Sequence, residues 1–367
     1  MIRILVDSLA DAALTNAQMV NAREIVSRLD PARFHISMFY VTEPDLRIAA
    51  RTATRLIKLP ARRQTLVILE EFLRGDQDII FYLKSSPAAK WFLRSSVLAG
   101  KRCRTIGTIE SQCDLHTEST VTPQATRLWE QTVLRCDYLF ANSHSVQRSL
   151  RNQYGLGSEM IPTGVDTEFF RGDGCRPPNL RPRPRVLFVG SLRPFKGPQM
   201  VLDAASRFSQ VDFVLVGDGV SGPELRARAA REQLTNVKFT GSLSLEAVRE
   251  EYRSADLLFF PSTWEGSPKV ILEAAACSLP VIASGKYEPE SVIHGKTGFL
   301  AAQPEEFFQH LETLVGNYEL RRAMGQAGRL LAEKFDWYLI TRQWEESFVR
   351  IAHSAPLRSR ARVAASL

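Results

Sequence analysis

The stretch ADLLFFPSTWEGSPKVILEAAACSLPVIAS, from Ala255 to Ser284, has the pattern of a strand, a loop, a helix and a second strand. A short apolar run at each end predicts a buried parallel strand. Between the two runs, Pro268 opens a segment that predicts a helix to about Ser278. The loop 262–267 therefore follows the carboxyl end of a strand and leads into a helix N-terminus. In open α/β sheets this is where ligands bind, and free helix amides favour anions.

Two carboxylates frame this loop, Glu265 within it and Glu273 on the predicted helix, with seven residues between them. Each alone is typical of an exposed acid. The whole pattern, PS-x-x-EG-x-x-K-V-x-L-E-A followed by C-x-LPVIAS, resembles the signature of retaining glycosyltransferases of family 4, the glycogen-synthase-like or group 1 enzymes. The resemblance implies that Glu265 binds sugar hydroxyls, with the Gly266 and Ser267 amides near them, and that Glu273 accepts hydrogen bonds from the ribose.

A second motif, GSLRPFKG at 190–197, follows a predicted strand. Backbone amides and a lysine just ahead of a helix suit a diphosphate, because both kinds of group face the same anion. The motif resembles the family's G-R-L-x-x-x-K-G, which implies that Lys196 is a catalytic cation. Ser191 stands where the family has arginine, and Arg193 is either the second cation or an exposed surface residue.

Other turns complete the donor site that the resemblance implies. The VGDG sequence that ends at Gly219 matches a family motif, and its glycines serve either close approach to the nucleotide or a tight turn. The full set of expected donor-binding residues is Glu273, Gly190, Ser191, Gly217, Gly219, Leu243, Gly266, Ser267 and Val270.

The N-terminal half is less similar to the family. An apolar strand at 2–7 opens a doubly wound domain, but the next loop lacks the family's paired glycines, and Asn16 is expected to cap the following helix. Where the family commonly has a histidine, at the end of a strand over 104–109, this chain has Glu110, with His116 six residues later. Glu110 has the better location for a catalytic role, and His116 is the alternative.

The segment from Arg171 to Arg185, RGDGCRPPNLRPRPR, is rich in proline and glycine and predicts a domain boundary. The resemblance implies the GT-B fold, an α/β architecture with two Rossmann-like domains facing a central cleft. The expected domains are an acceptor-binding domain over 1–175 and a nucleotide-sugar-binding domain over 183–336. A helix at 337–351 is expected to pack back on the first domain, and a basic tail at 352–367 to be disordered.

The composition fits a soluble globular protein, with 44% hydrophobic and 24% charged residues among 367. The sequence contains no apolar run of membrane-spanning length, and its start does not resemble a signal peptide. The five cysteines lack metal-ligand spacing and predict reduced thiols, so we expect a cytoplasmic protein without a disulfide or a structural metal.

The net charge of +7 is unevenly distributed, because residues 46–104 contain 13 Lys or Arg and 4 Asp or Glu, an excess of 13 − 4 = +9. Within this basic segment, Arg47, Arg51 and Arg55 have helical spacing, and the run KWFLR at 90–94 mixes aromatic and cationic residues. Such faces indicate either peripheral docking to the inner, anionic face of a membrane or a merely solvated helix. No nucleic-acid-binding motif is present, and no nucleic-acid partner is expected.

Together these features predict a retaining, metal-independent hexosyltransferase. It would move a hexose-type sugar from a nucleotide diphosphate sugar to a hydroxyl acceptor, and we expect a UDP-sugar in preference to a GDP- or ADP-sugar. The catalytic residues would be Glu265, Lys196, Arg193 and Glu110, with no metal and no cofactor. A lipid-linked or polysaccharide acceptor at a membrane surface follows only from the basic segment. The alternatives are a non-catalytic nucleotide-sugar-binding protein and a nucleotide-sugar epimerase of the same fold.

Overall fold

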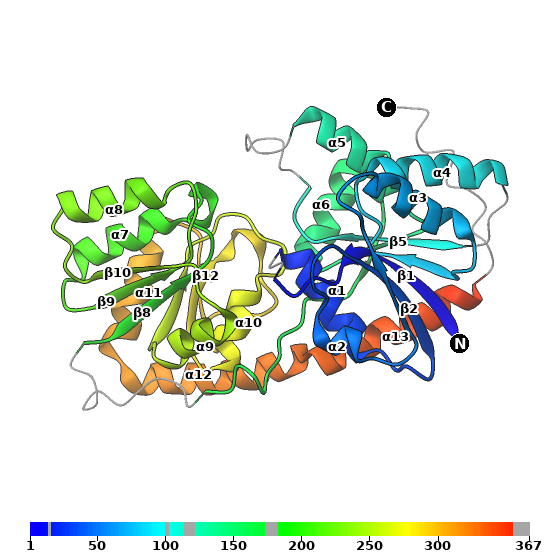
Figure 1. Ribbon diagram of the computed structural model, residues 1–367. Coiled ribbons are helices and arrows are strands. Elements are labelled where there is room, and N and C mark those ends of the chain that lie inside the picture. Colours follow the sequence, from blue (N-terminus) through cyan, green and yellow to red (C-terminus); the bar gives the residue numbers. More distant parts are fainter. Residues whose placement is uncertain (14–15, 100–102, 114–121, 173–182, 355–367) are drawn as a thin grey trace. The chain divides into compact units, whose positions relative to one another are not determined.

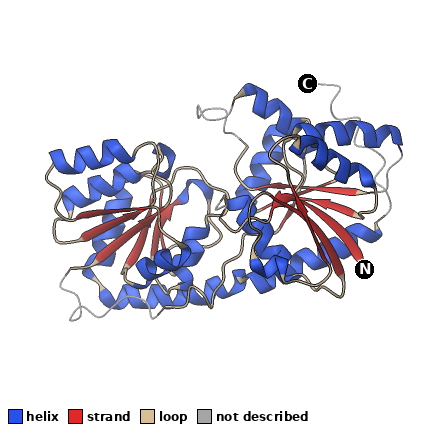
Figure 2. Cartoon of the chain, in the orientation of Figure 1, coloured by secondary structure: helices blue, strands red, loops and turns tan. Residues whose placement is uncertain are grey.

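The computed structural model of the chain describes all residues except 14–15, 100–102, 114–121, 173–182 and 355–367. His116 and most of the proline-rich segment lie outside the described residues. The chain forms two compact units, Met1–Pro162 with Tyr338–Leu367, and Thr163–Trp337. Each unit is a parallel sheet between helices (Figure 1; Figure 2), so the expected α/β class with two Rossmann-like halves is confirmed.

The first unit contains a seven-stranded parallel sheet in the order β3-β2-β1-β4-β5-β6-β7. Its order reverses between β1 and β4, which makes that position a topological switch point. The strands are β1 (Ile2–Leu9), β2 (Phe34–Tyr40), β3 (Thr54–Lys58), β4 (Ile79–Phe81), β5 (Arg104–Ile109), β6 (Tyr138–Ala141) and β7 (Glu159–Met160). The helices are α1 (Ala17–Arg28), α2 (Leu46–Ala49), α3 (Gln64–Arg74), α4 (Pro87–Ala99), α5 (Pro123–Glu130) and α6 (His144–Tyr154). Asn16 caps α1 as expected, because its side chain accepts from the Gln18 amide at 3.0 Å.

The basic segment contains the strand β3 and the helix α3, which the charge pattern did not predict. Arg47 lies in the short helix α2, Arg51 follows it, and Arg55 lies in β3, so the three do not share one helix face as their spacing indicated. Each is used within the protein. Arg47 pairs with Glu24, whereas Arg51 donates hydrogen bonds to backbone carbonyls.

Helix α13 (Trp337–His353) begins at the boundary between the units and packs on the sheet of the first unit through aromatic side chains. Trp344 lies 4.8 Å from Phe81 and 4.7 Å from Phe140 between ring centroids, and Phe348 lies 6.1 Å from Phe34. Large apolar surface is thereby buried between a C-terminal helix and N-terminal strands.

The second unit contains a six-stranded parallel sheet in the order β10-β9-β8-β11-β12-β13. The strands are β8 (Arg185–Val189), β9 (Asp212–Val216), β10 (Val237–Gly241), β11 (Leu257–Phe260), β12 (Val281–Ser284) and β13 (Gly298–Ala301). The helices are α7 (Pro198–Arg207), α8 (Gly222–Arg231), α9 (Leu245–Arg253), α10 (Lys269–Ala276), α11 (Pro304–Gly316) and α12 (Tyr318–Ala332). The stretch that opened the sequence analysis thus forms β11, α10 and β12, with both strands fully buried.

Candidate active site

The two strongest sequence motifs meet at the switch point of the second sheet. Strands β8 and β11 are parallel neighbours, with Leu257 opposite Val186. The chain continues from β8 to β9 on one side, whereas β11 lies on the other. Such a point, outside the carboxyl ends of the strands, is the usual ligand site of an open α/β sheet. The loop after β8 carries Lys196, and the loop after β11 carries Glu265.

Backbone contacts fix these two loops against each other. The Thr263 amide donates to the Phe195 carbonyl at 2.8 Å. Gly197 has a φ of +71°, and a Cβ atom there would lie 2.6 Å from the Pro261 carbonyl oxygen. The lysine motif therefore needs glycine at this position both for its left-handed backbone and for the close approach of the other loop.

Lys196 and Glu265 form an ion pair across the two loops, from Nζ to Oε1. The Ser262 hydroxyl donates to the same carboxylate oxygen at 2.7 Å. Both side chains are mostly buried, with exposed fractions of 20% for Lys196 and 11% for Glu265. Both contacts use Oε1, so Oε2 is the carboxylate oxygen that can accept from a ligand.

Helix α10 starts directly after this loop with its first amides uncapped by a side chain. Pro268 occupies the N-cap position and makes no side-chain capping bond. Gly266 is buried and Ser267 is half-buried just before it. Unsatisfied amides and the helix dipole together favour an anion at this end of the helix.

Glu273 lies farther along α10, half-buried, and is held by a buried tyrosine from α9. The Tyr252 hydroxyl donates to Glu273 Oε2 at 2.9 Å and to the Val270 carbonyl at 3.2 Å. Burial raises the pKa of the Glu273 carboxyl, although the hydrogen bond from Tyr252 and the charge of Lys269 oppose that shift. Among the described residues, no hydrogen bond or ion pair links Glu273 to Glu265 or Lys196.

The glycine turns after β8 and β9 pack on each other. Gly217 has a φ of +127°, and a Cβ atom there would lie 2.1 Å from the Gly190 carbonyl oxygen. A Cβ atom on Gly219 would lie 2.7 Å from the Leu192 carbonyl oxygen. Close packing between the two turns therefore requires glycine at both positions.

The other expected donor residues lie around these loops. Ser191 is half-buried in the turn after β8, and Leu243 packs partly buried against the core of the second unit. Arg193 is exposed just before Lys196 and forms no salt bridge with a described residue. The N–H donors of its guanidinium can therefore bind a ligand or water.

Glu110 belongs to a separate cluster, at the carboxyl edge of the first unit's sheet. Its Oε1 accepts from the Tyr82 hydroxyl at 2.6 Å and from the Asn21 amide at 3.1 Å, and the Asn142 amide donates to its backbone carbonyl at 3.2 Å. Tyr82 is buried and has a φ of +59°, a conformation that costs a non-glycine residue energy. Burial and the charge of Glu110 raise the Tyr82 pKa well above its ordinary value.

Sequence reasoning missed the residues that hold the expected carboxylates. Tyr252 lies 21 positions before Glu273, and Asn21 lies 89 positions before Glu110. In the structure Tyr82 follows β4 as Glu110 follows β5, but the sequence placed Tyr82 within a strand and gave no signal for its contact. Ser262 is part of the recognised motif, but only the structure shows that its hydroxyl contacts Glu265.

The fold defines a class, the GT-B type of α/β protein, and the two motifs lie together at the switch point of its second sheet. Residues 183–317 match the family model described as "Glycosyl transferases group 1". The match lies within the second unit, and it confirms the resemblance to this family that was inferred from the sequence.

One curated relative is similar over part of its length, and two solved structures share the fold of this chain. The D-inositol 3-phosphate glycosyltransferase of Corynebacterium jeikeium is 31% identical over 242 residues, which cover 59% of this chain and 58% of the relative. The chain thus spans little more than half the length of that relative. Sucrose-phosphate synthase from Thermosynechococcus elongatus has a TM-score of 0.77 at 19% identity, covering 96% of this chain and 99% of that one. HepE from Anabaena, solved with UDP and glucose, has a TM-score of 0.74 at 20% identity, covering 95% and 99%.

None of the described helices combines the length and the apolar character needed to cross a membrane. In the same part of the chain, no group of three or more His, Cys, Asp or Glu side chains is placed to hold a metal ion.

Proposed function

We propose that this protein is a retaining, metal-independent glycosyltransferase that moves a hexose-type sugar from a nucleotide diphosphate sugar to a hydroxyl acceptor. The observation that carries the proposal is the Lys196–Glu265 ion pair at the switch point of the second sheet. The lysine is suited to bind a diphosphate and the glutamate to bind sugar hydroxyls, and both lie in the segment that matches the group 1 glycosyl transferase model.

In the proposed reaction, Lys196 and the first amides of α10 bind the diphosphate and stabilise the charge that grows on it as it leaves. The exposed guanidinium of Arg193 supplies the second cation. Glu265 Oε2 accepts hydrogen bonds from the sugar, and the carboxylate is held in place for this by Lys196 and Ser262. Glu273 accepts from the ribose hydroxyls, oriented by Tyr252.

Retention follows if the acceptor attacks the sugar from the face that the diphosphate leaves. The bond from the anomeric carbon to the phosphate oxygen breaks, and a bond from that carbon to the acceptor oxygen forms. The acceptor's proton passes to the departing phosphate oxygen. This scheme requires no side-chain nucleophile, and the residues of the second unit serve to bind and to stabilise charge.

We propose a UDP-sugar as donor. HepE, whose fold this chain shares, was solved with UDP and glucose. Incubating the full chain with UDP-glucose and following the sugar by proton NMR tests donor use directly. Slow release of α-glucose at an early time, before mutarotation, is the expected result. Binding without any turnover of UDP-, GDP- or ADP-sugars would favour the alternative of a non-catalytic nucleotide-sugar-binding protein.

Glu110 is our candidate for the acceptor contact. It lies at the carboxyl edge of the first sheet next to that sheet's switch point, where an acceptor hydroxyl would meet a carboxylate already fixed by Tyr82 and Asn21. The strained backbone of Tyr82 is consistent with a site whose geometry is maintained for binding.

Replacing Tyr82 with phenylalanine tests this role. The variant removes the hydroxyl that orients Glu110 and keeps the ring, so kcat/KM for the acceptor should fall about tenfold while the KM for the donor is unchanged. Tyr138→Phe is the matched control, because the Tyr138 hydroxyl contacts Ser354 instead. Steady-state kinetics with each substrate varied in turn gives the answer. An equal loss in both variants would show that Tyr82 acts only on stability.

We further propose that the outer faces of α3 and α4 dock on an anionic membrane surface. These helices contact each other (Figure 1) and expose Leu66 by 59% and Trp91 by 62%. Exposed cations stand beside them, namely Arg62, Arg63 and Arg94. Amphipathic aromatic residues edged by arginine suit the interface of an anionic leaflet.

Exchange of Trp91 for serine should weaken binding to vesicles of phosphatidylcholine with phosphatidylserine by about tenfold, since a large apolar side chain no longer enters the interface. Leu330→Ser, which removes an equally exposed apolar residue from α12 in the second unit, is the control. Co-sedimentation measures both. If the wild-type protein does not sediment with anionic vesicles, the proposed docking surface is wrong, whereas the proposed transferase activity is unaffected.

A further inference from the structure

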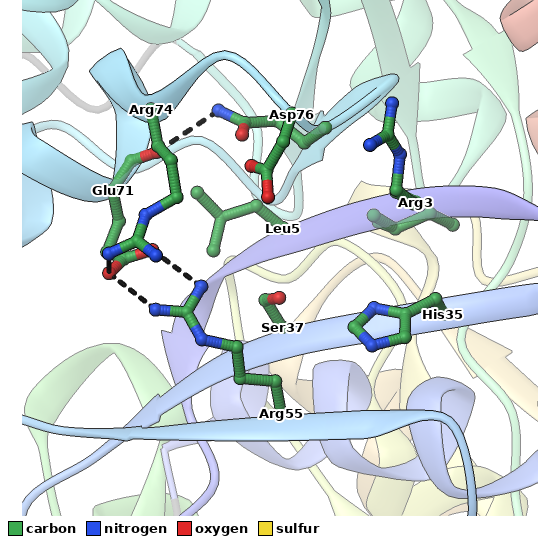
Figure 3. Close-up of a pocket in the computed structure, with 10 residues that line it drawn as sticks. Arg3, Leu5, His35, Ser37, Arg55, Glu71, Arg74 and Asp76 are labelled. Carbon is green, nitrogen blue, oxygen red and sulfur yellow. Dashed lines mark hydrogen bonds and ion pairs between the residues drawn. The ribbon is translucent and has the colours of Figure 1, made fainter.

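The first unit contains a pocket that the proposed reaction does not use. It has a volume of about 330 Å³ and lies between the strands β1 to β3 and the end of α3 (Figure 3). Its lining consists of Arg3, Ile4, Leu5, His35, Ser37, Arg55, Glu71, Arg74, Asp76 and Gln77. Glu110 and Tyr82 are not among these residues, so the pocket is distinct from the proposed acceptor contact.

Strand register explains why polar side chains gather here. Leu5, Ser37 and Arg55 form one row across β1, β2 and β3, and Arg3 stands opposite His35 in the row toward the amino ends. Two residues farther along β2 and β3, Phe39 stands opposite Ile57, and both are buried in the core beneath α3. The face of the sheet thus changes from apolar to cationic where α3 ends at Gly75.

The arginines are arranged around one buried carboxylate. Arg55 donates to both oxygens of Glu71, at 2.7 and 2.9 Å, and Arg74 donates to Oε1 at 2.9 Å. Figure 3 shows these two guanidinium groups converging on Glu71 while Arg3 lies on the other side of Leu5 and Ser37. Glu71 is only 7% exposed, so its charge is neutralised in place by the two arginines.

The lining contains many guanidinium donors that Glu71 does not use. Its three arginines stand against two acids of the lining, Glu71 and Asp76, and Arg3 also meets Asp78 outside it, so the formal charges balance. Each guanidinium has five N–H donors, whereas Glu71 takes two from Arg55 and one from Arg74. The side chain of Arg3 is 53% exposed, and its contact with Asp78 is a long one, at 3.8 Å.

We propose that this pocket binds a small phosphate-bearing anion. Planar guanidinium groups on several elements are the groups that best match the oxygens of a phosphate, and a buried carboxylate fixes two of them before the ligand arrives. The Ser37 hydroxyl and the His35 ring add donors on the floor of the pocket. The inference does not depend on the proposed transferase activity.

The test is a titration of the ¹⁵N-labelled full chain with sodium phosphate, against sodium chloride at equal ionic strength, observed through the arginine Nε–Hε NMR signals. The signals of Arg3, Arg55 and Arg74, assigned from single variants, should shift together and saturate with phosphate only. Arg3→Gln should weaken phosphate binding about tenfold. Arg127→Gln, which removes an exposed arginine of α5 outside the pocket, should leave the affinity unchanged.

Two further experiments identify the kind of phosphate compound that binds and distinguish this pocket from the donor site. Glycerol 3-phosphate and vesicles containing phosphatidic acid distinguish a soluble phosphomonoester from a lipid headgroup, and saturation by either one supports the site. In Lys196→Ala the three pocket signals should respond as in the wild type, so this site can fail or succeed independently of the donor site. Shifts that are equal in chloride, or an affinity unchanged by Arg3→Gln, would overturn the proposal.

Discussion

Replacing Lys196 with alanine is expected to lower kcat for sugar transfer by about two to three orders of magnitude, the loss typical when a preorganised group that stabilises transition-state charge is removed. Lys196 is the buried cation at the switch point, fixed by Glu265 on the neighbouring loop. Without it, the α10 amides and Arg193 face the growing diphosphate charge alone. Initial rates at saturating donor and acceptor measure the effect.

Two controls make this result specific. Lys238→Ala removes an exposed lysine from β10 in the same unit and should leave kcat unchanged. Lys196→Ala leaves Glu265 without its cationic partner, which costs about 1–3 kcal/mol of stability. The double variant Lys196→Ala/Glu265→Gln should therefore recover stability and remain inactive. A Lys196→Ala enzyme with wild-type kcat would contradict the assigned role.

The second large effect concerns Glu273, for which function and stability are expected to change in opposite directions. Glu273→Gln should weaken UDP binding at least tenfold, because an amide offers one acceptor oxygen where the carboxylate offers two. The same change should stabilise the ligand-free protein at neutral pH, because it removes a charge whose burial is unfavourable. Isothermal titration calorimetry and urea unfolding measure the two quantities.

The pH dependence of stability follows from the direction of the pKa shift. The folded pKa of Glu273 lies above its unfolded value, so the folded state binds this proton more tightly. The resulting contribution to stability is fully present below the unfolded pKa and is lost as pH rises through the folded pKa. The stability difference between Glu273→Gln and wild type should therefore grow over that interval. Glu312→Gln, which removes an exposed acid from α11 in the same unit, is the control and should show neither effect. Equal stability of Glu273→Gln and wild type at every pH would contradict this account.

The second unit was predictable from the sequence because its signals are local. The apolar runs of β11 and β12, Pro268 between them and the two motif loops each lie within a short segment of the chain. The contacts that orient the site are not local. Tyr252 reaches Glu273 from a different helix, and no periodicity or propensity marks that hydroxyl.

The basic segment shows the limit of charge patterns. Arg51 and Arg55 have helical spacing, yet they do not lie on one helix. Arg51 donates to backbone carbonyls, and Arg55, which lies in β3, pairs with Glu71. The sequence shows where the charged residues are, but the fold determines which group each of them contacts. For that reason the membrane proposal now depends on Trp91 and Leu66, whose exposure the structure gives.

The most direct test of the central claim is a thermal-shift panel of UDP, GDP, ADP and their glucose conjugates on the wild type and Glu273→Gln. A ligand that binds only the folded state raises the melting temperature by mass action. The account predicts that UDP and UDP-glucose raise the melting temperature of the wild type and that Glu273→Gln responds much less. If no nucleotide shifts the wild type, the second unit does not hold a nucleotide-sugar donor and the proposed function is wrong.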